Sequence, residues 1–107
     1  MSYSHPQHGR TVETGHLRKE AGRVLKEKRE AAGLTQRRLA EEVGFEYYTF
    51  IAQIEAGRGR IPPDRYDAYA KALGIPSKEF VKTMLRFYDP VTHQILFGVS
   101  GDESDDG

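Results

Sequence analysis

Glycine and proline residues divide the middle of the chain into short segments, and this division limits the folds that the chain can adopt. Each segment carries apolar residues at helical spacing and ends at a glycine, the residue that most readily takes the left-handed conformation beyond a helix. These glycines are Gly33, Gly44, Gly57 and Gly74. We therefore predict an all-α fold of short helices over residues 16–32, 36–43, about 46 or 47–56, and 62–73, with a fifth after Pro76-Ser77.

The apolar residues of each predicted helix fall on one face, which we expect to meet the core. The expected inward positions are Leu17, Ala21, Val24, Leu25, Lys28 and Ala32 in the first helix, Leu39, Ala40 and Val43 in the second, Phe45, Ile51 and Ile54 on or before the third, Tyr66, Tyr69, Ala70 and Leu73 in the fourth, and Phe80, Val81, Met84, Leu85 and Tyr88 in the fifth. The three tyrosine hydroxyls in this set are expected to reach water.

Residues 89–99 fit two structures. Asp89-Pro90 suits an N-cap and a first helical turn, and Gly98 suits a helix end, which favours a short helix over residues 90–97. The β-branched and aromatic residues of 94–99 are also typical of a strand. The expected fold class is thus a compact five-helix bundle plus a short C-terminal helix or strand.

The two ends differ from the middle in composition. Residues 1–15 are polar and lack helical periodicity, so we predict a flexible N-terminal arm before a domain over residues 16–89. A C-terminal element follows over residues 90–100, and residues 101–107 form an acidic tail that is expected to be disordered. The chain has equal numbers of basic and acidic residues, sixteen each, but the four acids of the tail leave +4 on the first 100 residues. The tail could also compete with a polyanion for these basic residues.

Several classes of function are excluded or disfavoured. With no cysteine, the chain has no disulfide, thiolate zinc site or cysteine nucleophile. No apolar run approaches the roughly 20 residues that span a bilayer, and no signal-like segment opens the chain, so we expect a cytoplasmic protein without membrane contact. His5 and His8 lack further metal ligands nearby, and we find neither a nucleophile beside a base nor a phosphate-binding loop. We expect no enzyme activity, metal or cofactor.

The most informative stretch is residues 34–60, where two short helices are separated by a turn that contains Gly44. Such a turn permits the sharp crossing of a helix-turn-helix. If the apolar residues of the second of these helices face the core, its opposite face carries Tyr48, Thr49, Ala52 and Gln53. Tyr47, Tyr48 and Phe50 span too wide an arc for all three rings to be buried; Phe50 is expected in the core or against a partner.

Donors for phosphate flank this face on both sides. Gln36, Arg37 and Arg38 stand at the start of the helix over 36–43, where the helix dipole also attracts anions, and Arg37 is the likelier contact of the two arginines. Arg58 and Arg60 follow in a glycine-rich loop. Gln53 suits a bidentate contact with adenine, whereas tyrosine and the threonine methyl suit the thymine methyl, so we expect A·T pairs in the site. The expected DNA-binding residues are Gln36, Arg37, Tyr47, Tyr48, Thr49, Gln53, Arg58 and Arg60.

The chain contains, in this order, Gly33-Leu34-Thr35-Gln36, Leu39-Ala40, Gly44, Ile54-Glu55 and Gly57. This order resembles the lambda-repressor-like (Cro and XRE type) helix-turn-helix family over about residues 20–85. The resemblance implies a five-helix DNA-binding fold that binds as a dimer and usually represses transcription. It implies that Gln36 clamps a phosphate, that Tyr48, Thr49 and Gln53 read base edges, and that Glu55 is structural. One extra residue between Gly44 and Glu55 leaves open whether Tyr47 or Tyr48 takes the first reading position.

We thus expect a sequence-specific transcriptional regulator at the nucleoid, a homodimeric repressor with helix 47–56 in the major groove of double-stranded DNA. The dimer contact is expected in the fifth helix and residues 90–99, where apolar side chains exceed what a small monomer exposes. These side chains are Phe87, Ile95, Leu96, Phe97 and Val99. The alternative is an antitoxin or adaptor that binds a protein partner and DNA only secondarily.

Overall fold

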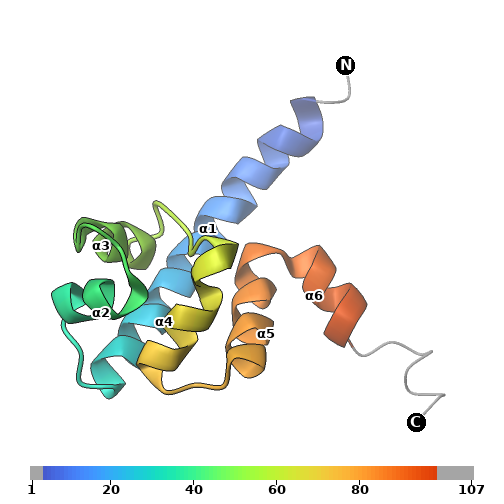
Figure 1. Cartoon of the computed structure of the whole chain (residues 1–107). Helices are drawn as coiled ribbons and strands as arrows, with labels where there is room; N and C mark the ends of the chain where they lie inside the picture. The colour runs from blue at the N-terminus through green and yellow to red at the C-terminus, as the bar shows by residue number, and fades with distance from the viewer. Residues whose placement is uncertain (1–3, 99–107) are drawn as a thin grey trace, which may run out of the picture.

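The computed structural model describes the backbone of residues 4–98 and the side chains of residues 15–98, and this part of the chain is helical without strands (Figure 1). Its elements are α1 (Ser4–Ala31), α2 (Gln36–Val43), α3 (Thr49–Glu55), the single 3-10 turn η1 (Pro63–Arg65), α4 (Tyr66–Leu73), α5 (Ser77–Tyr88) and α6 (Pro90–Phe97). The predicted all-α bundle is confirmed. Val99 and the acidic tail lie outside the described residues.

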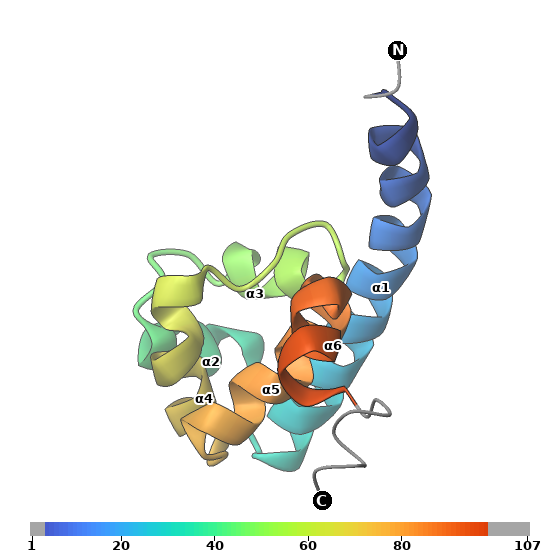
Figure 2. The same cartoon turned by 90° about the vertical axis from the view of Figure 1, so that its right-hand side faces the viewer.

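The helix α1 begins at Ser4 rather than at His16, so the absence of apolar periodicity did not mark its start. Pro6 stands in the first turn, where a missing backbone N–H removes no helical hydrogen bond. Extension of an existing helix gains one hydrogen bond for each residue that it fixes, so it needs no packed face. Figures 1 and 2 show the first turns of α1 projecting beyond the other helices. The division of the chain at residue 15 stays a prediction.

Local capping sets the ends of α2 and α6. The Oγ1 atom of Thr35 accepts a hydrogen bond of 3.0 Å from the backbone N–H of Arg38, and Gly44 ends α2 in the left-handed conformation with φ 88°. The carboxylate of Asp89 caps α6 by accepting from the backbone N–H of Thr92. The hydroxyl of Thr92 also donates to this carboxylate, and this hydrogen bond, together with that from the backbone, lowers the pKa of Asp89. Both helices therefore have their predicted bounds, and the strand alternative for residues 94–99 is wrong for the described residues 94–98.

The third helix starts later than predicted, at Thr49, with Tyr48 as its cap. The extra residue lies in the connection before α3, which the backbone hydrogen bond from Phe45 to Ala40 O (2.9 Å) ties to the end of α2. The ring of Phe50 packs at 5.5 Å from Phe45 and at 6.2 Å from Tyr47. This aromatic cluster holds the connection against the first turn of α3, so residues 46 and 47 stay outside the helix.

The core lies where α1, α2, α3, α4 and α5 meet. Its buried residues are Ala21, Leu25, Leu39, Ala40, Val43, Ile51, Ile54, Ile61, Tyr69, Ala70, Leu73, Phe80 and Met84. The rings of Tyr69 and Phe80 stack at 5.8 Å. The predicted faces are confirmed at these positions, to which Ile61 is an unpredicted addition. Two positions of the first helix are corrected: Arg29 is buried instead of Lys28, and Ala32 is exposed beyond the last residue of α1. A spacing of four residues from Ala21 through Leu25 leads to Arg29, one position beyond Lys28.

The tyrosine hydroxyls, which were expected to reach water, have other surroundings: two accept hydrogen bonds from the connection between α3 and α4, and the third is buried. The hydroxyl of Tyr66 accepts a 2.7 Å hydrogen bond from Arg60, and that of Tyr88 accepts one of 3.2 Å from the backbone N–H of Ile61. Burial raises the pKa of Tyr88 to about 12. The hydroxyl of Tyr69 is buried without a hydrogen-bond partner among the described residues.

The closest approach between α1 and α3 occurs at Gly22. A Cβ atom placed on this glycine would overlap the backbone carbonyl of Glu55, and backbone cannot move aside as a flexible side chain can. Gly22 therefore sets how near the end of α3 lies to α1.

We expect Gly22→Ala to lower the free energy of unfolding by about 1–3 kcal/mol, because the added methyl group forces the two helices apart. The matched control is Gly15→Ala in the same helix, where nothing lies within 4 Å of the added atom. That variant should be neutral or more stable by up to about 1 kcal/mol, since alanine has the higher helix propensity. Urea denaturation of both variants measures the difference, and equal stabilities would contradict the close approach.

Candidate nucleic-acid interface

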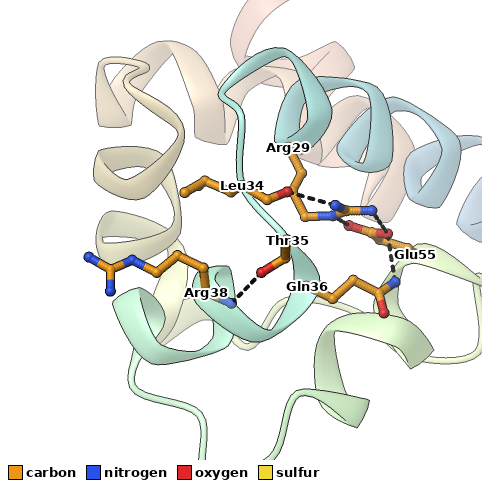
Figure 3. Close-up of polar contacts among 6 residues, drawn as sticks. All are labelled: Arg29, Leu34, Thr35, Gln36, Arg38 and Glu55. Atoms are coloured by element: carbon orange, nitrogen blue, oxygen red, sulfur yellow. Dashed lines mark hydrogen bonds and ion pairs between the residues drawn. The ribbon is translucent and has the colours of Figure 1, made fainter.

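A buried ion pair ties the end of α3 to α1. The guanidinium of Arg29 donates to the carboxylate of Glu55 through Nε (2.6 Å) and Nη2 (3.1 Å), and its Nη1 donates to the carbonyl of Leu34 at 2.8 Å. The amide of Gln36 adds a hydrogen bond of 3.0 Å to the same carboxylate. Figure 3 shows Arg29, Gln36 and Glu55 converging from α1, α2 and α3; we call these three residues the anchor cluster.

The anchor cluster fixes the direction of α3. The side chains of Arg29 and Glu55 are only 9% and 4% exposed, so neither charge has water to replace its partner. The hydrogen bond to Glu55 raises the pKa of Arg29. Glu55 has the structural role that was expected, but sequence reasoning missed Arg29. The sequence did contain a signal for it: Arg29 follows the apolar residues Ala21 and Leu25 at the same spacing of four, which places a charge on the buried face of the helix.

The outward face of α3 carries the side chains that were predicted to read bases. Thr49 and Gln53 are exposed and lie one turn apart on the same face, and Tyr48 at the cap is 43% exposed. Tyr47, in the preceding connection, is 58% exposed. Phe50 is also exposed, at 48%, so the expectation of a core position for it is wrong and a partner contact remains open.

The predicted phosphate contacts divide into two groups. Arg37 is exposed and its guanidinium lies 4.8 Å over the ring of Tyr48, and Arg58 is exposed with its Nε donating to the Oε1 atom of Gln53 at 2.9 Å. Arg60 instead donates to Tyr66 and lies 4.4 Å over the ring of Tyr88. The structure thus gathers Arg37 and Arg58 beside α3 but turns Arg60 toward the bundle.

The charge on the interface comes from these same two arginines. Arg38 forms ion pairs with Glu41 (3.4 Å) and Glu42 (3.0 Å), which offset its charge. Among the residues whose side chains are described, no carboxylate pairs with Arg37 or Arg58. The half-buried Gln36 begins α2 beside Arg37, with its amide oriented by Glu55. The arrangement suits an anionic surface laid across the start of α2 and the outward face of α3.

Other kinds of site find no support in the described part of the chain. No group of three or more histidine, cysteine, aspartate or glutamate side chains is placed to hold a metal ion there. No described helix combines the length and apolarity required to cross a membrane.

We expect Glu55→Gln to lower the free energy of unfolding by about 3 kcal/mol, since it leaves the buried guanidinium of Arg29 without a counter-charge. The control is Glu42→Gln, which breaks only the ion pair of the exposed Arg38 and should change stability by at most about 1 kcal/mol. Chemical denaturation monitored by circular dichroism gives both values. Similar losses for the two variants would show that the anchor cluster is not the stronger constraint.

The match to a known family covers the region just described. A family model described as a helix-turn-helix matches residues 25–93, more than half of the chain, from within α1 into α6. No curated protein matches the chain. With the helix pair α2–α3 in place and its outward face exposed, the chain belongs to the Cro/C1-type helix-turn-helix family, whose members are DNA-binding regulators.

Proposed function

We propose that this protein is a sequence-specific transcriptional repressor that binds double-stranded DNA as a homodimer, with α3 in the major groove. The observation that carries the proposal is the exposed outward face of α3, which the buried anchor cluster directs. It is flanked by Arg37 and Arg58, which have no carboxylate partner among the side chains of residues 15–98. A repressor of this kind acts by occupying its site, and its place in the cell is the nucleoid. Selection of bound duplexes from a random pool tests the proposal directly.

The start of α2 is proposed to bind the phosphate backbone. Gln36 and Arg37 stand in its first turn, where backbone N–H groups and the helix dipole also favour an anion. Because the oxygen atoms of Glu55 orient the amide of Gln36, this side chain has little rotational freedom to lose on binding. These contacts set the depth and register of α3 in the groove without selecting a sequence.

The reading of bases is assigned to the side chains that α3 and its cap expose. Thr49 and Tyr48 offer hydroxyl groups together with apolar surface for a thymine methyl group, and Gln53 stands one turn further along. Tyr47 lies beside them in the connection before the helix. Arg60 is left out of the proposed interface, because its guanidinium is engaged by Tyr66 and Tyr88.

We expect binding to a selected duplex to weaken linearly in log K with log salt, since bound phosphates release their counterions. Arg37→Ala should reduce the magnitude of this slope by about one. Arg38→Ala is the matched control, because Glu41 and Glu42 already offset that charge, and its slope should stay close to that of the parent protein. Fluorescence anisotropy at several salt concentrations measures all three slopes. A slope that Arg37→Ala leaves unchanged argues against a phosphate contact at this residue.

The proposed dimer contact is α6. On this eight-residue helix, three apolar side chains are mostly exposed: Val91 at 69%, Ile95 at 71% and Leu96 at 58%. A contiguous exposed apolar patch of this kind is typical of a protein–protein contact. Figure 1 shows α6 on the opposite side of the domain from α2 and α3. A two-fold axis at α6 therefore leaves the outward face of α3 uncovered in both copies. Phe87 and Phe97, also expected in the contact, are half-buried and contribute less.

We expect Ile95→Asp to shift the protein from dimer to monomer in sedimentation equilibrium, because the contact would bury an unpaired carboxylate. Affinity for a two-half-site duplex should fall at least tenfold, and affinity for a single half-site should not change. Lys78→Asp serves as the control, since it places an acid at the exposed N-terminal turn of α5, where the helix dipole favours it. A dimer that persists in Ile95→Asp would place the contact elsewhere.

A further inference from the structure

We propose that Arg58, held in place by Gln53, reads a guanine in the major groove. This inference rests on the proposed DNA binding by α3 and names one base that the site recognises. It changes the role of both residues: Arg58 becomes a base contact instead of a phosphate contact, and Gln53 becomes the residue that positions it.

Arg58 is attached to Gln53 at two points. Its backbone N–H donates to the carbonyl of Gln53 at 3.0 Å, and its Nε donates to the Oε1 atom of the same residue at 2.9 Å. Gly57 makes the first contact possible, because its left-handed backbone (φ 82°) turns the chain back along the helix. The long side chain of Arg58 is thereby directed along the outward face of α3.

The loop that carries Arg58 is itself fixed to the bundle. A Cβ atom on Gly57 would lie 2.9 Å from the backbone and side chain of Lys19, so the turn packs directly on α1. The next glycine, Gly59, passes close to Gln53, with 3.9 Å between its hypothetical Cβ and the Cβ of Gln53. Arg58 therefore stands on a supported turn beside the reading face.

The atoms that Arg58 leaves free match guanine. Its Nε donates to Gln53, and no hydrogen bond from Nη1 or Nη2 is found among the described residues, so both nitrogens can donate elsewhere. This end of a guanidinium donates two parallel hydrogen bonds to O6 and N7 of guanine, the commonest specific contact in the major groove. Phosphate oxygens accept the same pair of hydrogen bonds, but a phosphate contact carries no sequence information, so base preference separates the two roles.

The same hydrogen bond argues against adenine as the base opposite Gln53. A bidentate contact with adenine uses both the amide oxygen and the amide nitrogen of glutamine. Here the oxygen already accepts from Arg58 through one of its two lone pairs, so a bidentate contact with adenine would have to share this oxygen with Arg58. We therefore expect a G·C pair at the position that Arg58 reaches, and A·T pairs only where Thr49 and Tyr48 make contact.

The test is selection of duplexes from a random pool by the full-length protein and by variants at both positions. The parent protein should enrich sites with an invariant guanine. Arg58→Lys retains the charge but not the fork, so it should lose tenfold to a hundredfold in affinity for that site and little for a site with the guanine replaced. Arg58→Ala should show the same loss of preference. Arg38→Lys is the matched control, and its preferences should stay unchanged.

Variants of Gln53 separate support from direct reading. Gln53→Glu retains an acceptor for the Nε of Arg58 but removes the amide donor, so the guanine preference should persist even if overall affinity falls. Gln53→Ala removes the acceptor that holds Arg58, so this variant should also lose the guanine preference. In a double-mutant cycle, the double variant should lose no more of that preference than Arg58→Ala alone.

Each further outcome has one meaning. A guanine preference that survives in Arg58→Ala overturns the inference, because another residue must then read the guanine. Loss of a selected adenine in Gln53→Glu makes Gln53 the direct reader and also overturns it. If the parent protein enriches duplexes without any guanine that depends on Arg58, the inference fails and the proposed function stands. If the parent protein enriches no duplex at all, the proposed function fails as well.

Discussion

The ion pair between Arg29 and Glu55 connects the two parts of the molecule on which DNA binding depends, the long helix α1 and the end of α3. A buried ion pair adds little net stability compared with apolar residues of the same volume, but the loss of one partner is costly. Its effect is therefore on geometry. Only one orientation of α3 keeps the carboxylate of Glu55 paired with Arg29, and any other orientation leaves a buried charge unpaired. Gln36 shares the same carboxylate, so the start of α2 is fixed by the same atoms. The contact proposed for phosphate and the helix proposed for bases are in this way held at a constant relative position.

Glycines allow this arrangement to close. Gly22 lets α1 lie directly against the backbone of Glu55, and Gly57 turns the chain after α3 onto α1. The anchor cluster and the turn that carries Arg58 therefore both rest on the same stretch of α1. The support of the outward face of α3 is rigid, because at these two glycines backbone packs on backbone, which cannot adjust as side chains do. The apolar surface of α6 lies on the far side of the domain, so the proposed dimer contact and the proposed DNA interface occupy different faces (Figure 1).

Local chemistry explains which parts of the fold were predictable. The bounds of α2 and α6 follow from Thr35, Gly44 and Asp89, whose side chains or backbone conformations act within a few residues. The start of α3 was not predictable in this way, since the ring of Phe50 packing on Phe45 settles it and that contact crosses a turn. The start of α1 was missed for the opposite reason, because a projecting helix needs no apolar face and leaves no periodicity to detect.

The amino-acid sequence by itself determined the helical class, the helix-turn-helix segment and the set of polar side chains around it, because helix period, caps and glycine stops are local properties. Only the tertiary structure decided which residue each of those side chains contacts. Arg58 and Arg60 are two residues apart in one loop, yet the first lies beside Gln53 and the second beside Tyr66. No local rule separates them. Their partners come from different helices, and the path of the chain between α3 and α4 determines which partner each arginine meets.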